Sequence, residues 1–348
     1  MSSIPTDHPT AAPFPSLAIK KQRLLTGDQL LAIAVRGAAV IVLLMLVSLV
    51  AVLLKASWPA WTTFGSQFVT SKEWRPNELE QPKRDAAGKL IYNEDNEVET
   101  VTLPAQFGAL SVIWGTAVSA VIALVIAVPL AIGAALFLIR LAPEKMRGPV
   151  SFLIEFLAAV PSIAYGIWGL FVLVPLLQGY IEPGVLKVFG LSGTVAVTGR
   201  DMLCGGLILG IMILPIITAV SRDVLAAVPT HQIEGTLALG ATWWQSAWQM
   251  LGYAKAGLFG AIMLGLARAA GETMAVTMVI GNNNQISANL FKPAQTMASL
   301  LANEFGNPES DLHRSALIAV ALILLVMSLG FNIVARYLVV GGGSRKAS

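Results

Sequence analysis

The sequence predicts an all-α membrane protein with six transmembrane helices, and three observations lead to that prediction. Hydrophobic residues make up 55% of the 348 residues and charged residues only 12%, about half the share in a soluble domain. The mean hydropathy is +0.72. The apolar residues also form blocks, several of them as long as the roughly 20 residues that cross a bilayer as a helix. Together these features exclude an ordinary soluble enzyme.

Three regions follow from the distribution of the apolar blocks. We expect a polar cytoplasmic N-terminal tail at 1–30, a membrane domain at 31–340 and a short C-terminal tail at 341–348. The first block is too long for the core of a cleaved signal peptide. The second exceeds the length of a span and contains Pro129, so we expect it to tilt, protrude or kink. The six predicted spans are 31–54, 107–139, 152–177, 205–220, 255–281 and 315–340.

Basic residues near the span ends predict that both termini are cytoplasmic. Lys and Arg accumulate on the cytoplasmic side of membrane proteins. With both termini inside, five of these residues fall outside: Lys55, Lys187, Arg200, Lys292 and Arg314. Eleven fall inside: Lys20, Lys21, Arg23, Arg140, Lys145, Arg147, Arg222, Lys255, Arg336, Arg345 and Lys346. Because the basic residues flank apolar blocks and form no patch with aromatic residues, we expect no nucleic-acid partner.

The external loop at 57–106 and the small residues inside the spans carry further expectations. Within the loop, 77–100 is typical of an exposed, partly disordered insertion. Gly206-xxx-Gly210 and Ala261-xxx-Gly265 have the spacing that lets membrane helices approach closely. The single cysteine, Cys204, excludes an intramolecular disulfide and is expected to be buried.

The predicted cytoplasmic loop at 221–254 is only mildly apolar and reads as two short helices. The first covers about 229–239 and stops at Gly240, a residue suited to the left-handed conformation that ends a helix. The second has a capping box of Thr242 and Gln245. Trp243, Trp244 and Trp248 then give it an aromatic face. That face fits either an interfacial helix at the level of the lipid headgroups or a docking element for a cytoplasmic partner.

The loop resembles the "EAA" loop of ABC-transporter permeases, in which a coupling helix meets an ATPase subunit. The residues that carry the resemblance are Glu234, Gly235, Thr236, Leu237, Ala238, Leu239 and Gly240. Gly235-Thr236 departs from the usual Ala-Ala. Gly252-Tyr253 replaces the usual Leu-Pro, and the missing proline predicts a more continuous second helix.

Four other segments resemble one branch of that family, the permeases of phosphate-specific importers. The segments 155–163 with 165–170 and 265–277 are similar to its third-helix and fifth-helix signatures. Ser71-Lys72-Glu73-Trp74 and 301–305 are more similar to its C-type than to its A-type subunit. The resemblance covers about 31–340 and leaves out the charged insertion at 77–100.

The resemblance implies a type I ABC importer permease in the bacterial inner membrane, a non-catalytic subunit that forms half of a pathway for inorganic phosphate. It implies an A-type permease, two copies of a cytoplasmic ATPase, an external phosphate-binding protein and membrane lipid as partners. No cofactor or metal would be bound by this chain, because ATP and Mg²⁺ would lie on the ATPase. ATP binding would close the ATPases and switch the pathway from inward to outward access.

Arg268 and Glu272 form the candidate substrate pathway on grounds of their own. A charge at the centre of a membrane helix costs about 2.5 to 3.5 kcal/mol or more. At a spacing of four, the two residues would share one face of the fifth helix. They could merely neutralise each other, but an arginine fork also suits a phosphate oxyanion. Our hypothesis is that Glu272 holds Arg268 when the pathway is empty and that phosphate competes for the guanidinium. Glu155 is a weaker candidate.

Three alternatives remain to be weighed. The sequence has no Gly-x4-Gly-Lys-Ser/Thr loop for nucleotide phosphates, so ATP hydrolysis would need another chain. An importer for another oxyanion, or a secondary transporter with Glu272 as a proton relay, is the first rival. An intramembrane serine protease is the second, from the pattern Gly190-Leu191-Ser192-Gly193. Because all three histidines lie outside the predicted spans and lack ligand spacing, we expect neither that chemistry nor a metal site.

Overall fold

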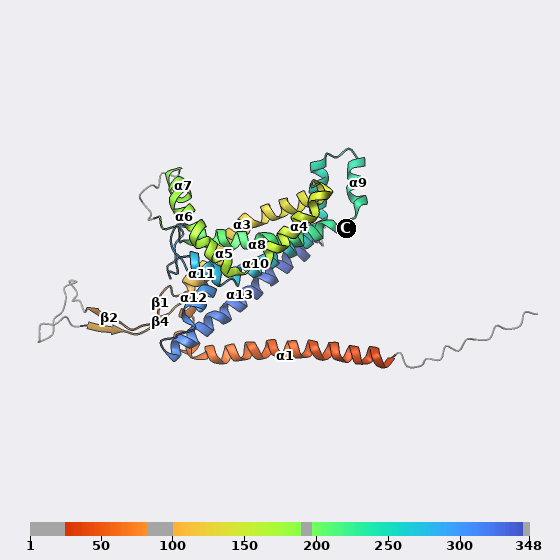
Figure 1. Cartoon of the computed structure of the whole chain (residues 1–348). Helices are drawn as coiled ribbons and strands as arrows, with labels where there is room; N and C mark the ends of the chain where they lie inside the picture. Colours follow the sequence, from red (N-terminus) through yellow and green to blue (C-terminus); the bar gives the residue numbers. More distant parts are fainter. Residues whose placement is uncertain (1–24, 83–99, 189–196, 344–348) are drawn as a thin grey trace, which may run out of the picture. The chain divides into compact units, whose positions relative to one another are not determined.

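Six helices of the computed structural model are long and apolar enough to cross a membrane (Figure 1). The structure describes residues 25–82, 100–188 and 197–343. Within these residues the six candidate spans are Leu31–Phe64, Leu110–Arg140, Ser162–Val188, Met202–Ala226, Trp243–Ala270 and Asp311–Ile333. The predicted number of spans is therefore confirmed, with shifted boundaries.

Helices account for most of the described chain, which divides into two units, Met1–Ala51 and Val52–Ser348. The boundary falls within helix α1, Leu25–Phe64, whose apolar sequence suits a lipid environment. The second unit holds the other helices: α2 Gln67–Thr70, α3 Leu110–Arg140, α4 Glu144–Ala158, α5 Ser162–Trp168, η1 Gly169–Leu173, α6 Val174–Leu176, η2 Leu177–Ile181, α7 Glu182–Val188, α8 Met202–Ala226, α9 Thr230–Ala238, α10 Trp243–Ala270, α11 Met274–Val279, α12 Met297–Glu304 and α13 Asp311–Gly343.

The third span differs from its prediction at 152–177. The apolar residues that follow Phe152 belong to α4, which ends at Ala158, and the span itself begins at Ser162 after Pro161. A proline disfavours the helical conformation of the residue before it, so a break at Val160-Pro161 has a local cause. The span then continues through two π-helical segments, η1 and η2, as far as α7. Hydropathy alone merged two helices that a proline separates.

Helix α8 forms the centre of the second unit, with α3, α4 and α10 packed around it. Glycines allow this close packing. A Cβ on Gly206 would lie 2.5 Å from Ile122 of α3, and a Cβ on Gly265 of α10 would lie 2.6 Å from Ile217 of α8. The predicted use of small residues at helix contacts is therefore confirmed, and Cys204 is buried among them as expected.

Two short β-ribbons occupy the loop between the first two spans. Strand β1, Trp74–Arg75, pairs antiparallel with β4, Gln106–Phe107, and β2, Leu79–Pro82, pairs antiparallel with β3, Thr100–Leu103. The loop was expected to contain a partly disordered insertion at 77–100. Its base is instead an ordered ribbon, and residues 83–99 lie outside the described part. We call the end of the second unit that carries β1 and β4 the ribbon end; α9 lies at the opposite end (Figure 1).

Candidate functional site

Local sequence signals position α9 and the start of α10. Helix α9 ends at Ala238, and Gly240 follows with φ +84°, a conformation that glycine adopts without strain. Thr242 and Gln245 then form the predicted capping box: Oγ1 of Thr242 accepts from the Gln245 N–H at 3.3 Å, and the Thr242 N–H donates to Oε1 of Gln245 at 2.8 Å. Both caps confirm the sequence prediction.

The second helix of this loop was expected to be short, and that expectation is wrong. It starts at Trp243 and continues into the fifth span as the single helix α10, which ends at Ala270. The predicted effect of replacing Leu-Pro by Gly252-Tyr253 is thus confirmed, because no proline interrupts the helix here. As a result α9 is joined by a tight turn to a helix of 28 residues that reaches the other end of the unit.

One side of α9 is anchored and the other is exposed. Ile233 is buried in a cluster with Leu136 of α3 and Met250 of α10. The Thr236 hydroxyl donates to the Ile233 carbonyl at 2.7 Å and lies 3.3 Å from Oγ of Ser246. The other residues of the candidate loop are exposed, and Leu239 reaches 90% exposure: Glu234, Gly235, Leu237, Ala238, Leu239 and Gly240. An exposed apolar surface on a firmly held helix suits a partner protein.

The tryptophans beside α9 divide between packing and exposure. Trp243 is half-buried and packs on the cluster around Met250, whereas Trp244 and Trp248 are exposed. The Trp244 ring lies 6.0 Å from that of Trp243 and 6.1 Å from that of Trp248. The exposed pair therefore extends the surface of α9 along the first turns of α10.

Arg268 and Glu272 lie on opposite sides of a helix break. Helix α10 ends at Ala270, Gly271 caps it, and α11 starts at Met274. The predicted continuous helix at 255–281, with both residues on one face near its middle, is therefore wrong. Arg268 occupies the last turn of α10 and is exposed, whereas Glu272 is 6% exposed. Among the described residues no ion pair joins them.

The break gives each charge a helix end that it suits. Oε1 of Glu272 accepts from the Ala275 N–H at 3.3 Å, so the carboxylate caps the start of α11. Arg268 lies at the carbonyl end of α10, where a positive charge is favourable. The hypothesis that Glu272 holds Arg268 therefore needs revision: in this conformation Glu272 caps a helix, and the guanidinium of Arg268 is open to an anion.

Glu155, the weaker candidate, belongs to an ion pair near the α9 end. Its Oε1 accepts from Nη1 of Arg222 at 3.1 Å, and Arg222 also binds Oδ1 of Asp223 at 2.8 Å. Since the Glu155 side chain is 57% exposed, the contact is a surface ion pair that joins α4 to α8.

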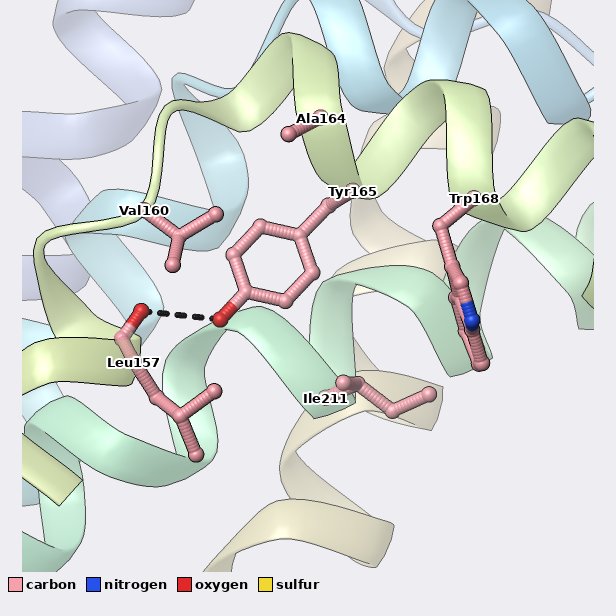
Figure 2. A pocket seen from close by; sticks show the side chains of 6 residues that line it. All are labelled: Leu157, Val160, Ala164, Tyr165, Trp168 and Ile211. Carbon is pink, nitrogen blue, oxygen red and sulfur yellow. Dashed lines mark hydrogen bonds between the residues drawn. The ribbon is translucent and has the colours of Figure 1, made fainter. Parts of the chain in front are cut away.

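An apolar pocket of about 290 Å³ lies beside the break between α4 and α5 (Figure 2). The Tyr165 hydroxyl in its wall donates to the Leu157 carbonyl at 2.8 Å, so its hydrogen is already used (Figure 2). No charged side chain lines the pocket, which is a poor environment for phosphate. Its lining residues are Leu157, Val160, Ala164, Tyr165, Trp168 and Ile211.

The structure joins two segments that the sequence singled out separately. Nε1 of Trp74 donates to Oε2 of Glu304 at 2.8 Å, so the Ser71–Trp74 and 301–305 motifs meet at the ribbon end. His313 completes the contact: its Nε2 lies 2.9 Å from the same oxygen, and its Nδ1 accepts from the Glu309 N–H at 3.1 Å. That acceptance fixes the tautomer with hydrogen on Nε2. Sequence reasoning treated His313 as an ordinary loop histidine and missed this network.

The remaining candidates acquire no reactive neighbours. Ser192 lies outside the described residues. His231 is exposed on α9, and His313 is buried in the network at the ribbon end. Within the described ranges, no three side chains of the metal-binding types come together.

Comparison with known proteins gives one consistent set of relatives. Residues 127–340 match the family "Binding-protein-dependent transport system inner membrane component". A "Phosphate transport system permease protein PstC" of Mesorhizobium japonicum is 40% identical over 91% of this chain and 91% of its own length. The protein of that name from Pasteurella multocida is 40% identical over 86% and 88%. Among solved structures, the inward-facing MetNI methionine ABC transporter matches with TM-score 0.47 and 18% identity, covering 65% of this chain and 90% of that chain.

Proposed function

The chain belongs to the family of binding-protein-dependent transport system inner membrane components, and we propose that it is the permease subunit through which an ATP-driven importer moves inorganic phosphate. It is a multi-pass inner-membrane protein and a non-catalytic part of the transporter. Its curated relatives are phosphate permeases along almost their whole length, which supports phosphate as the substrate over another oxyanion.

The observation that carries this proposal is the shape of the α9 loop. A helix held by Ile233 and Thr236 presents Glu234, Leu237 and Leu239 outward, and none of these three side chains is buried by the rest of the chain. An ATPase subunit that binds this surface moves α9, and the capping box at Thr242 passes the movement to α10. Movement at the ATPase therefore reaches Arg268, in the last turn of the same helix.

At the far end of α10, Arg268 is the group that we assign to phosphate. Its guanidinium offers paired donors to the oxygens of a tetrahedral anion, and it is exposed on this chain. Glu272 lies close in sequence and would repel the anion if it faced it directly. By capping α11 it keeps its charge on backbone N–H groups and positions the turn that follows Arg268.

The assembly completes what one chain lacks. We assign the second half of the pathway to an A-type permease, ATP and Mg²⁺ to two copies of an ATPase bound at α9 and its counterpart, and phosphate delivery to a binding protein at the ribbon end. Both termini and α9 then lie in the cytoplasm, on the side where most of the basic residues near the span ends fall. Energy passes through the chain as a shift between two packings, so α9 must bind the ATPase differently in each.

Copurification followed by an uptake assay tests this function. The chain, tagged and expressed with its neighbours in the membrane, should copurify with an ATPase and a second permease. In vesicles, the complex should take up labelled phosphate only with ATP, and an excess of sulfate should not compete. If the chain purifies without an ATPase, or if sulfate competes as well as phosphate, the proposal is wrong in its coupling or in its substrate.

A further inference from the structure

Two carboxyl groups are buried together at the ribbon end, away from Arg268 and from α9. Glu182 is the first residue of α7 and Asp201 is the N-cap of α8, and both are 0% exposed. The segment before α8 approaches η2 closely: Gly199, with φ +67°, lies so near that a Cβ would be 2.5 Å from the Val174 carbonyl oxygen. This approach brings Asp201 beside the residue that follows η2.

Most of the oxygens of this pair have no donor. Oδ1 of Asp201 accepts from the Cys204 N–H at 2.8 Å, as an N-cap residue does. In the described part of the chain, Oδ2 of Asp201 and both Oε atoms of Glu182 have no hydrogen-bond donor, although all three are buried. Buried acceptors without a donor are rare because they lose their water without compensation. A hydrogen atom between the two carboxyl groups, which are within hydrogen-bonding reach, would supply the missing donor.

The surroundings offer no positive charge to replace that hydrogen. The cations of the packed segments, Lys187, Arg200 and Lys292, are exposed, and none forms an ion pair with either carboxylate among the described residues. Tyr180 of η2 is 78% exposed. The titratable group that lies buried against both carboxyl groups is the Cys204 thiol, which cannot neutralise them. Two carboxylates in such a site cannot both ionise without strong repulsion.

The pKa of Asp201 agrees with this geometry. Burial, the largest cause, raises the pKa of the Asp201 carboxyl from 3.8 to about 7, and the charge of Glu182 adds to the rise, while the Cys204 N–H lowers it. Because the folded pKa lies above the ordinary value, the stabilisation from the bound proton is complete below pH 3.8 and is lost as the pH rises through about 7.

We propose that Glu182 and Asp201 form a proton-binding site, in which one shared proton fastens α7 to the start of α8 at the ribbon end. Removal of the proton leaves two buried negative charges that push α7 away from α8. On the orientation proposed above, the ribbon end faces the outside, so this contact holds at acidic external pH and loosens at alkaline pH. The site is separate from the phosphate contact at Arg268.

Hydrogen exchange of the intact complex tests the proton site. Protection factors, corrected for intrinsic exchange, should be measured for peptides of α7 and of 197–206 between pH 6 and pH 9. In the wild type we expect protection to fall by up to about tenfold for each pH unit above 7. Glu182→Gln should abolish that dependence, because an amide donates to Asp201 at every pH. Asp201→Asn should do the same while it preserves the cap of α8.

The control and a change of cation decide the remaining cases. Asp311→Asn removes a fully exposed carboxylate of the same unit and should leave the pH dependence intact. Protection that is equal at pH 6 and pH 9 in the wild type would overturn the proposal. So would protection at pH 9 that Na⁺ or Ca²⁺ restores, since the pair would then be a cation site. A dependence that persists unchanged in Glu182→Gln places the titrating group elsewhere and also overturns it.

Discussion

The α9 loop and the α10–α11 break lie at the two ends of one helix, and different forces shape them. At the α9 end, a positive-φ glycine and a capping box within a few residues set the geometry, and the surface beyond them is exposed. At the other end, α10 stops without proline, and Glu272 is buried as the cap of a six-residue helix. The comparison teaches that the docking surface is locally encoded, whereas the anion contact depends on packing.

The largest effect should come from removing the guanidinium at the break. Arg268→Gln deletes charge-assisted hydrogen bonds worth about 1.5 to 3 kcal/mol each, so loss of two should reduce phosphate uptake by more than about a hundredfold. The ATPase should still copurify, because α9 is untouched. Arg314→Gln, which removes an exposed arginine at the ribbon end, is the matched control and should transport normally. Normal uptake by Arg268→Gln would remove this residue from the pathway.

A change on the exposed side of α9 should have the opposite pattern. Leu239→Glu places a charge in the proposed ATPase contact, where central apolar residues commonly contribute about 2 kcal/mol or more, so copurified ATPase should fall by about thirtyfold. The fold of the permease should be unchanged, since Leu239 is 90% exposed. Phe305→Glu makes a similar change at an exposed residue of the ribbon end and should keep the ATPase. Equal ATPase recovery from both variants would argue against docking at α9.

A pair of glycines on α10 tests whether packing sets one end of the helix more than the other. Gly265→Ala places a methyl group 2.6 Å from the fully buried Ile217, and overpacking of this kind costs about 1 to 3 kcal/mol. Gly252→Ala meets no atom within 4 Å and should be neutral or slightly stabilising. Thermal unfolding of the purified complex measures the difference. Equal unfolding temperatures for the two variants would show that α10 does not depend on its contact with α8.

The smallest effect concerns the cap of α11. Glu272→Ala removes the acceptor of the Ala275 N–H and should cost about 1 kcal/mol, whereas Glu272→Gln keeps an acceptor oxygen and should cost less. Exchange of the Ala275 amide hydrogen would report the cap directly. If Gln is as damaging as Ala to this protection, the charge of Glu272 matters in a way that capping does not explain.

Sequence reasoning succeeded where the signals were local. Hydropathy predicted six spans, and Gly240 with the Thr242–Gln245 box predicted both caps of the α9 loop. It failed where distant segments decide. Nothing near Gly271 marks the end of α10, and Glu304 gave no sign of its bond to Trp74, 230 residues earlier. The third span was misplaced even though Pro161 was visible, because the apolar residues around it outweighed that single break in the hydropathy pattern.

The central claim, that this permease is driven by ATP, is tested most directly by labelled phosphate uptake into vesicles that contain the complex, the binding protein outside and ATP inside. A protonophore is added to collapse the proton gradient. We predict that uptake continues with the protonophore and stops when ATP is replaced by ADP. Uptake that stops with the protonophore and proceeds without ATP would identify a proton-coupled transporter and contradict this account.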